Sequence, residues 1–552
     1  MKNGRRIAAL VTALLMCLVL LVACKDDSGS VDAPQGSAAP ASSAPASSPA
    51  PSAAPSTAGD VAPPVEAPTG ADVRFADEIT AITDGFAVAA INPLLPGIAM
   101  PPVFWTYNMI YDRLLLTNTD DIQIPYLATE WETDDYVTFT FKLRDDVYFH
   151  NGDKFTANDV VWTALTGKEV PGAPSNSIWS FVKDAVALDD YTVQFVLNDI
   201  NVDFWWHVSR TETGILNERA VTADPERGTW IGTGAYRLTE FVPNDHWVFD
   251  RNEDYWGEPP ITKKINMLHI PEQTTRAMML RNGDAQLVFN MPAEAVDQFE
   301  DNPDYVVYQH MRNTPGPIYF NMSHPICGDW NFRMAVGSAI DKNEITTAVG
   351  GRFLLPEYET GGLWGLMTEF RNLDIPLVPE DLEAAKAYLA ASPYNGETIT
   401  ITGASPDHVR AAEVIQMELA RIGIETEINA VENTAVPNLH AENKLEILVT
   451  GMNFPLSATA IRPLLYPDLP TNRTRHNNPR VTEMLDQAAR EPDRAEREKI
   501  YMEIQAIVAE DPPYFNIWWN VVPNIGVKGI GGFTQPGDNS YDLRYMYWQI
   551  EG

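Results

Sequence analysis

Cysteine is scarce in this chain. The 552 residues include three, Cys17 and Cys24 near the amino terminus and Cys327 in the middle. A globular part that holds a single thiol cannot form an internal disulfide, so its stability must come from large hydrophobic cores. The sequence around Cys327 shows no pattern typical of a histidine-activated nucleophile, and we interpret this residue as a bystander.

Basic residues are also few. The chain has 39 Lys and Arg against 75 Asp and Glu, which gives a formal net charge of −36. Such a protein would be repelled by a nucleic acid, and no basic stripe is present, so nucleic acid is excluded as a partner. The apolar fraction of 45% is ample for globular folding, and the length predicts two or more lobes.

Motifs that carry chemistry are missing. The nine histidines include no i, i+4 pair, and the sequence contains no H-E-x-x-H, C-x-x-C, G-x-S-x-G or Walker A pattern. Gly232 and Gly234 begin a G-x-G, but Arg237 stands where a dinucleotide fingerprint needs its third glycine. The sequence therefore predicts no enzyme activity, no cofactor and no metal site.

The amino terminus has the features of an export signal. Lys2, Arg5 and Arg6 precede an almost wholly apolar run over 7–22, and the small residue Ala23 stands directly before Cys24. The segment "LVAC" resembles the bacterial lipobox, which implies that Cys24 becomes the lipidated first residue. The alternative is an uncleaved membrane anchor, because the run is close to the minimum length for spanning a bilayer. Both interpretations place the rest of the chain outside the cytoplasm.

A long linker follows. Residues 28–70 are dominated by Ala, Pro and Ser, and no aromatic residue occurs between Lys25 and Arg74. Such a segment cannot bury a core, so we expect a disordered tether.

From Asp72 onward, helical and strand patterns alternate. Residues 397–454 read as a strand, a helix and two further strands, which is α/β patterning. Residues 479–511 read as two helices divided at Pro492, and 514–527 ("YFNIWWNVVPNIGV") as a strand. The predicted fold class is mixed α/β.

The stretch 138–163, "TFTFKLRDDVYFHNGDKFTANDVVWT", is the most strongly patterned part. It alternates as a strand and then contains Asn151-Gly152, a typical hairpin turn. Thr156 with Asp159 three residues later resembles a helix capping box. Each of these features has a folding reason, so we interpret the stretch as framework.

This stretch, together with "LATEW" before it, resembles the signature of the family 5 extracytoplasmic solute-binding proteins. These are the oligopeptide, dipeptide and nickel-type receptors of ABC importers. The resemblance continues downstream in "GTGAY", "RNEDYWGEPPITKKINMLHI" and "FRMAVGSAIDKNEI", and it spans Asp72 to the carboxyl terminus.

The resemblance implies a two-lobed, periplasmic-binding-protein-like cleft fold with an extra domain, and hinges near Asn321 and Glu510. The implied boundaries are a signal peptide at 1–23, the lipidated Cys and linker at 24–71, lobe I at 72–118, 229–322 and 510–552, domain II at 119–228, and lobe III at 323–509.

The resemblance also places the ligand between lobes I and III. Peptide-binding members carry an aspartate at the end of a lobe III strand, where it pairs with the α-amino group of the peptide. Here Asn453 stands at the matching position. An amide cannot neutralise a buried ammonium group, so this departure weakens the case for a free peptide. Met452 and Phe454 flank this position and are further candidates.

Other candidate ligand contacts are an aromatic residue, an arginine and a loop. Trp364 follows a helix in a Gly-rich loop and could stack on a ligand, or it could be ordinary packing. Arg462 is one of three arginines, with Arg473 and Arg475, that could meet a ligand carboxylate; solvated surface is the alternative. The remaining candidates lie in the first loop of lobe I: Phe86 and Asn92.

The resemblance implies a monomeric lipoprotein that captures a solute for an ABC permease and its ATPase. A peptide is the default ligand. An oligosaccharide, another polar solute or a nickel chelate is an alternative cargo, and a sensor or a structural surface lipoprotein is an alternative role.

Overall fold

The structure is a computed structural model. It describes residues 67–69, 73–83, 88–97, 101–117, 122–357, 364–365, 368–451, 454, 457–467, 469–534 and 541–550. All of them belong to one compact unit, Ala54–Gly552.

An 11-stranded sheet organises the described residues, in the order β16-β15-β17-β13-β18-β12-β2-β11-β10-β9, with β14 (Leu354–Pro356) paired to β18 off this path. The strands that follow β18 in this order form half A, and the strands that precede β13 form half B. Half A consists of β2 (Glu78–Thr83), β9 (Tyr236–Val242), β10 (His246–Arg251), β11 (Lys264–His269) and β12 (Leu287–Val288). Half B consists of β15 (Ile399–Gly403), β16 (Thr426–Ala430) and β17 (Ile447–Val449).

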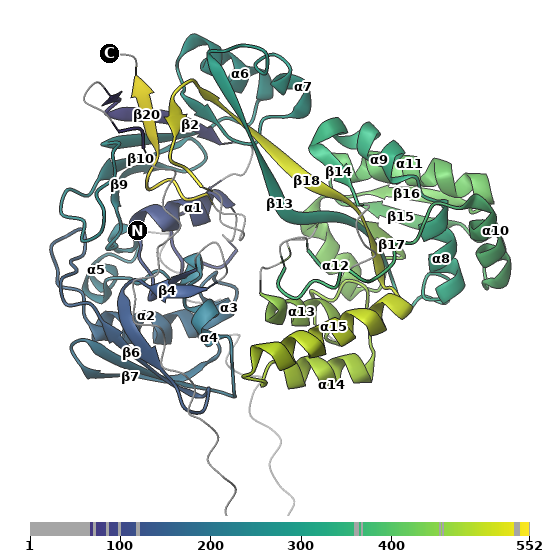
Figure 1. The fold of residues 1–552 in the computed structure, drawn as a ribbon, viewed down its shortest axis with the longest axis horizontal. Coiled ribbons are helices and arrows are strands. Elements are labelled where there is room, and N and C mark those ends of the chain that lie inside the picture. Colours follow the sequence, from purple (N-terminus) through teal and green to yellow (C-terminus); the bar gives the residue numbers. More distant parts are fainter. Residues whose placement is uncertain are drawn as a thin grey trace, which may run out of the picture. The chain divides into compact units, whose positions relative to one another are not determined.

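Two long antiparallel strands, β13 (Tyr305–Phe320) and β18 (Tyr514–Val527), join the halves (Figure 1). The end of β13 pairs with β17 in half B, and the end of β18 pairs with β12 in half A. Between the halves the register of the pair shifts near Pro315 and Gly316. A Cβ on Gly316 would lie 1.9 Å from the Trp518 ring, so only glycine lets this indole pack on the strand.

Half B has a core on each face. Alternation along the strands sends Ile318 and Val449 into one core, and Tyr319 and Leu448 into the other. The first core packs against helices of half B: α8 (Trp330–Ala339), α10 (Leu382–Ala391) and α11 (Pro406–Ile422). The second core packs against α14 (Pro479–Ala488) and α15 (Arg494–Glu510).

Half A is covered by α1 (Pro101–Ile110) and α6 (Gln273–Asn282). In α1, Trp105 packs at 4.7 Å from the Tyr541 ring and at 5.0 Å from the Phe289 ring. α6 ends at Gly283, which adopts the left-handed conformation that a glycine cap favours.

A separate four-stranded sheet has the order β5-β6-β8-β7 and holds the most strongly patterned stretch of the sequence. Phe139, Phe141 and Leu143 are buried on one face of β6, as the alternation predicts. Gly152 has a φ of 86° in the turn, and the capping box of α2 is formed. The bounds are β5 (Ala128–Glu132), β6 (Thr138–Leu143), β7 (Val182–Asp189), β8 (Thr192–Leu197) and α2 (Ala157–Lys168).

Candidate ligand site at the carboxyl edge of half B

The parallel strands of half B end beside the crossing strands. β15 runs parallel to β16 and β17, and β17 runs antiparallel to β13. Gly451, just beyond β17, therefore lies beside Thr314: a Cβ on this glycine would be 3.7 Å from the Thr314 side chain and 3.7 Å from His408. In α/β sheets, ligands bind outside the carboxyl ends of the parallel strands. This edge is our candidate site.

His408, in the first turn of α11, is a titratable group at this edge. Its ring stacks on Trp518 with 6.2 Å between centroids. Its Nδ1 lies 2.7 Å from Ser405 Oγ, which also accepts the His408 backbone N–H as the helix N-cap. Burial lowers the pKa of His408 to about 4; Asp407 opposes this shift and the charge of Arg473 reinforces it. The imidazole is therefore neutral at pH 7 and can offer a ligand a hydrogen bond but no charge.

Of the candidates around Asn453, the structure describes Phe454. Met452 and Asn453 lie outside the described residues. Phe454 is buried, and its backbone N–H donates to the Asn313 carbonyl oxygen at 2.9 Å. In return, Asn313 Nδ2 donates to the Phe454 carbonyl oxygen at 3.1 Å. These bonds hold Phe454 against β13, and the ligand contacts expected of Asn453 and Met452 stay predictions.

Trp364 lies inside the second core of half B. Its side chain is 0% exposed and packs edge-on against Tyr501 at 5.4 Å. The next residue, Gly365, packs so closely on Asn313 that a Cβ would lie 2.2 Å from the amide oxygen. The contact that Trp364 makes in this conformation is packing, and stacking on a ligand stays a prediction.

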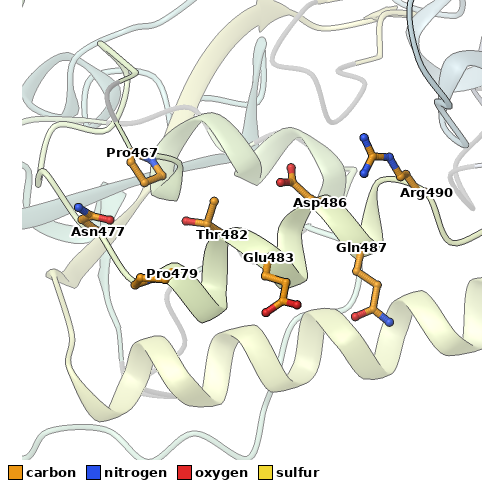
Figure 2. Close-up of a pocket in the computed structure, with 8 residues that line it drawn as sticks. All are labelled: Pro467, Asn477, Pro479, Thr482, Glu483, Asp486, Gln487 and Arg490. Carbon is orange, nitrogen blue, oxygen red and sulfur yellow. The ribbon is translucent and has the colours of Figure 1, made fainter. Parts of the chain in front are cut away.

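Arg462 has an ionic partner. Its Nη2 lies 2.6 Å from Asp486 Oδ1, and its guanidinium carbon lies 3.9 Å from the centre of the Tyr466 ring. Asp486 borders an open hollow of about 660 Å³ beside α14 (Figure 2). The charge of Arg462 is thus matched within the protein, and the residue faces the α14 surface.

In the first loop, Phe86 lies outside the described residues. Asn92 is half-buried, and its side-chain oxygen accepts the Leu94 backbone N–H at 2.8 Å. The side chain therefore supports a local turn. A ligand contact by either residue stays a prediction.

The structure adds two residues that the sequence did not single out. Tyr319 belongs to the second core of half B and Thr450 directly follows β17, and the OH of each is buried without a hydrogen-bond partner among the described residues. The alternation of β13 and β17 predicts that such side chains point inward. It gives no information on whether the hydroxyl finds a partner.

No group of three or more His, Cys, Asp or Glu side chains in the described part of the chain is arranged to hold a metal ion. Within the same residues, no helix is long and apolar enough to cross a membrane.

Comparison with known sequences gives the family. The sequence profile of the bacterial extracellular solute-binding proteins, family 5 (middle region), matches residues 123–466, more than half of the chain. The chain belongs to this family. The matched region contains the motifs from "LATEW" to the α/β unit of half B, so the family resemblance predicted from the sequence is confirmed.

Two family 5 relatives and one solved structure illustrate which known proteins this chain is similar to. The nickel-binding periplasmic protein of Escherichia coli is 27% identical over 63% of this chain and 70% of its own length. The dipeptide-binding protein DppE of Bacillus subtilis is 24% identical over 79% of this chain and 86% of its own. The periplasmic binding protein DppA of Helicobacter pylori, solved with the peptide STSA, superposes with a TM-score of 0.71 at 23% identity, over 86% of this chain and 99% of its own.

The fold class is therefore confirmed. The structural neighbours are two-lobed periplasmic binding proteins, and this chain is mixed α/β with the same architecture.

Proposed function

We propose that this family 5 protein is the receptor of an ABC importer that captures a peptide-like solute between half A and half B and passes it to a membrane permease. The observation that carries the proposal is the carboxyl edge of β15 and β17, where Gly451 lies beside Thr314 at the register shift of β13 and β18. Relatives described as dipeptide-binding and as solved with a bound peptide support a peptide as the cargo.

The proposed receptor performs no covalent chemistry. Ser405 and His408 at the candidate edge are in contact, so a hydrolase is the rival to consider. Ser405 is engaged as the N-cap of α11, and a histidine with a pKa of about 4 is a poor general base at pH 7. We expect Ser405→Ala to leave binding intact, and peptides recovered from the protein to be uncleaved.

We also propose which residues contact the cargo. Asn453 with Met452 and Phe454 would line half B. Phe86 and Asn92 would approach from the first loop, and Trp364 and Arg462 would border the site. The two hydrogen bonds between Phe454 and Asn313 support Phe454 in this group, because they hold Phe454 next to the crossing strand β13.

We also propose the domain boundaries that the family resemblance implies. Lobe I comprises 72–118, 229–322 and 510–552, domain II comprises 119–228, and lobe III comprises 323–509. The pairing of β13 and β18 across the two halves supports hinges in these strands or at their ends near Asn321 and Glu510.

We further propose that Cys24 carries a lipid anchor and that residues 24–71 tether a monomeric receptor outside the cytoplasm. The "LVAC" sequence and the Ala/Pro/Ser composition support this. Metabolic labelling with a radioactive fatty acid tests it: the wild type should be labelled and Cys24→Ser should not.

Thermal unfolding of the purified chain tests the cargo. Di- to octapeptides at millimolar concentration should raise Tm, since a ligand that binds only the folded state stabilises it by mass action. Maltose- and cello-oligosaccharides should not. A rise with oligosaccharides and none with peptides would reject the peptide and favour the rival cargo.

A further inference from the structure

Two aspartates of the four-stranded sheet pair with arginines of half B. Asp199, which follows β8, lies with its Oδ2 2.6 Å from Nη2 of Arg490, just after α14. Asp203, at the start of α4 (Phe204–His207), lies with its Oδ1 3.8 Å from Nη2 of Arg497 in α15. Among the described residues, the four-stranded sheet shares no strand with the main sheet. These ion pairs therefore link it to half B without strand pairing.

The four-stranded sheet is attached to half A. His150, between β6 and α2, donates its backbone N–H to the Gly232 carbonyl oxygen at 2.8 Å. Its Nε2 lies 2.9 Å from the Gly234 carbonyl oxygen, and its own carbonyl oxygen accepts Nη1 of Arg237 in β9 at 2.9 Å. The helices α14 and α15 belong to half B, because they pack on its second core. The two ion pairs therefore join half A to half B.

The inner pair is enclosed by the protein. The side chains of Asp203 and Arg497 are 13% and 12% exposed. Arg497 Nη1 also donates to the carbonyl oxygens of Glu491 and Pro492, at 2.9 and 3.1 Å, which fixes the guanidinium group. Burial raises the pKa of Asp203, and the charge of Arg497 opposes the rise. A carboxylate at this depth needs its cationic partner, so the pair favours conformations in which the halves meet here.

A third carboxylate connects this contact to the candidate site. Glu369 of half B lies 3.1 Å from Nη2 of Arg494, in the first turn of α15. The residue before it, Thr368, accepts Nδ2 of Asn313 at 3.1 Å through its hydroxyl. The same Asn313 amide donates to the Phe454 carbonyl oxygen. The contact between the halves and the candidate edge therefore share one hydrogen-bonded segment of half B.

We propose that Asp199 and Asp203, paired with Arg490 and Arg497, form a latch that holds half A and half B together around the cargo. Hinges in β13 and β18 let the halves move apart, and the ion pairs exist only when the halves lie as close as they do here. A ligand between the halves favours the same arrangement, so latch and ligand stabilise each other. This rests on the proposed receptor function and adds that residues outside the ligand site strengthen retention of the cargo.

Charge reversal and its repair test the latch. Asp199→Arg sets two arginines face to face, whereas the swap Asp199→Arg with Arg490→Asp restores an ion pair in the opposite sense. Both side chains are more than half exposed, so neither change disturbs a core. The matched control is Glu503→Arg. It makes the same charge change opposite Arg480, but that pair lies within half B, between α14 and α15.

Small-angle X-ray scattering of the ligand-free full chain measures how far the halves open. In about 10 mM NaCl, Asp199→Arg should have a larger radius of gyration than the wild type, and the swap and the control should match the wild type. In about 1 M NaCl the difference between wild type and Asp199→Arg should narrow, because salt screens the exposed pair. Equal radii for these two proteins in low salt, or the same increase in the swap or the control, would overturn the proposal.

Titration calorimetry with trialanine measures the effect on the cargo. In low salt, Asp199→Arg should bind trialanine at least about 3-fold more weakly than the wild type, and the swap and Glu503→Arg should stay within about 2-fold of it. Equal affinities of wild type and Asp199→Arg would overturn the proposal. If trialanine binds to none of these proteins, the scattering measurement alone supports or overturns the latch, and the wider peptide screen decides whether the proposed cargo is wrong.

Discussion

Glu418 is a buried carboxyl group next to the start of another helix. It lies on α11, is 1% exposed, and its Oε1 accepts the backbone N–H of Asp341, the N-cap of α9 (Lys342–Val349). Burial raises the pKa of Glu418 to about 8; Glu344 and Asp341 add to the rise, while the Asp341 N–H bond and Arg421 oppose it. The side chain is therefore largely protonated at pH 7.

This shift predicts a pH dependence of stability. The folded pKa lies above the unfolded one, so the contribution of Glu418 is fully present below about pH 4.5 and is lost as the pH rises through about 8. Glu418→Gln keeps an uncharged acceptor for Asp341, so the variant should gain stability relative to wild type between pH 5 and pH 9 (values chosen to bracket the transition), by on the order of a few kcal/mol. Urea unfolding at both pH values measures the difference. Parallel profiles for the two proteins would refute the assignment.

Residue-level function was harder to predict than residue-level packing. The inward direction of Phe139 and Phe141 follows from strand alternation alone. Whether Trp364 faces a ligand or a core does not, because its packing partner Tyr501 is 137 residues away in sequence (501 − 364). The three arginines that look equivalent in sequence also differ through tertiary contacts. Arg462 pairs with Asp486, Arg475 donates to the His440 carbonyl oxygen, and Arg473 Nη1 is buried with no hydrogen-bond partner among the described residues.

Among the elements, α2 shows how a local sequence determines a helix start. Asp159 Oδ2 accepts both the backbone N–H and the hydroxyl of Thr156 at 3.0 Å, which completes the capping box that the sequence predicts. Asp159→Ala leaves that N–H without its acceptor and should lower the free energy of unfolding by about 1 kcal/mol in a urea titration. The exposed control Asp145→Ala should change it by less than about 0.5 kcal/mol. Equal effects of the two substitutions would mean that the box contributes nothing.

Elements with a strong internal pattern were predictable. The strand expected over 514–527 is β18, with the same bounds, and the two helices expected around Pro492 are α14 and α15. Residues 103–116 carry apolar side chains at helical spacing throughout, but α1 stops at Ile110 and Leu115–Thr117 forms β3. The β3 residues pair with β4 (Gln123–Pro125), and apolar residues that fit a helix also fit a short buried strand.

At the scale of the molecule, charged contacts join segments that are far apart in sequence. Asp199 lies after β8, and its carboxylate is 2.6 Å from Arg490 at the end of α14. Nearby, Asp203 lies 3.8 Å from Arg497 of α15, with both side chains almost buried. Burial raises the pKa of Asp203, and Arg497 opposes the rise.

These two pairs should differ in strength. A double-mutant cycle on Asp199→Asn and Arg490→Gln should give a coupling of about 0.2–1 kcal/mol that vanishes in about 1 M NaCl, because both groups are exposed. The cycle on Asp203→Asn and Arg497→Gln should give a larger coupling that persists in salt, because water screens it less. Urea unfolding in low and high salt measures both. A salt-sensitive coupling of the buried pair would contradict this account.

The central claim is that the protein binds a peptide-like solute without altering it. The purified chain is incubated with an equimolar library of synthetic two- to eight-residue peptides, separated from free peptide by gel filtration, and its retained small molecules are analysed by mass spectrometry. We predict that intact peptides are retained at up to one per protein and that heat-denatured protein retains none. Retention no greater than in the denatured control, or recovery of cleaved fragments, would contradict the account.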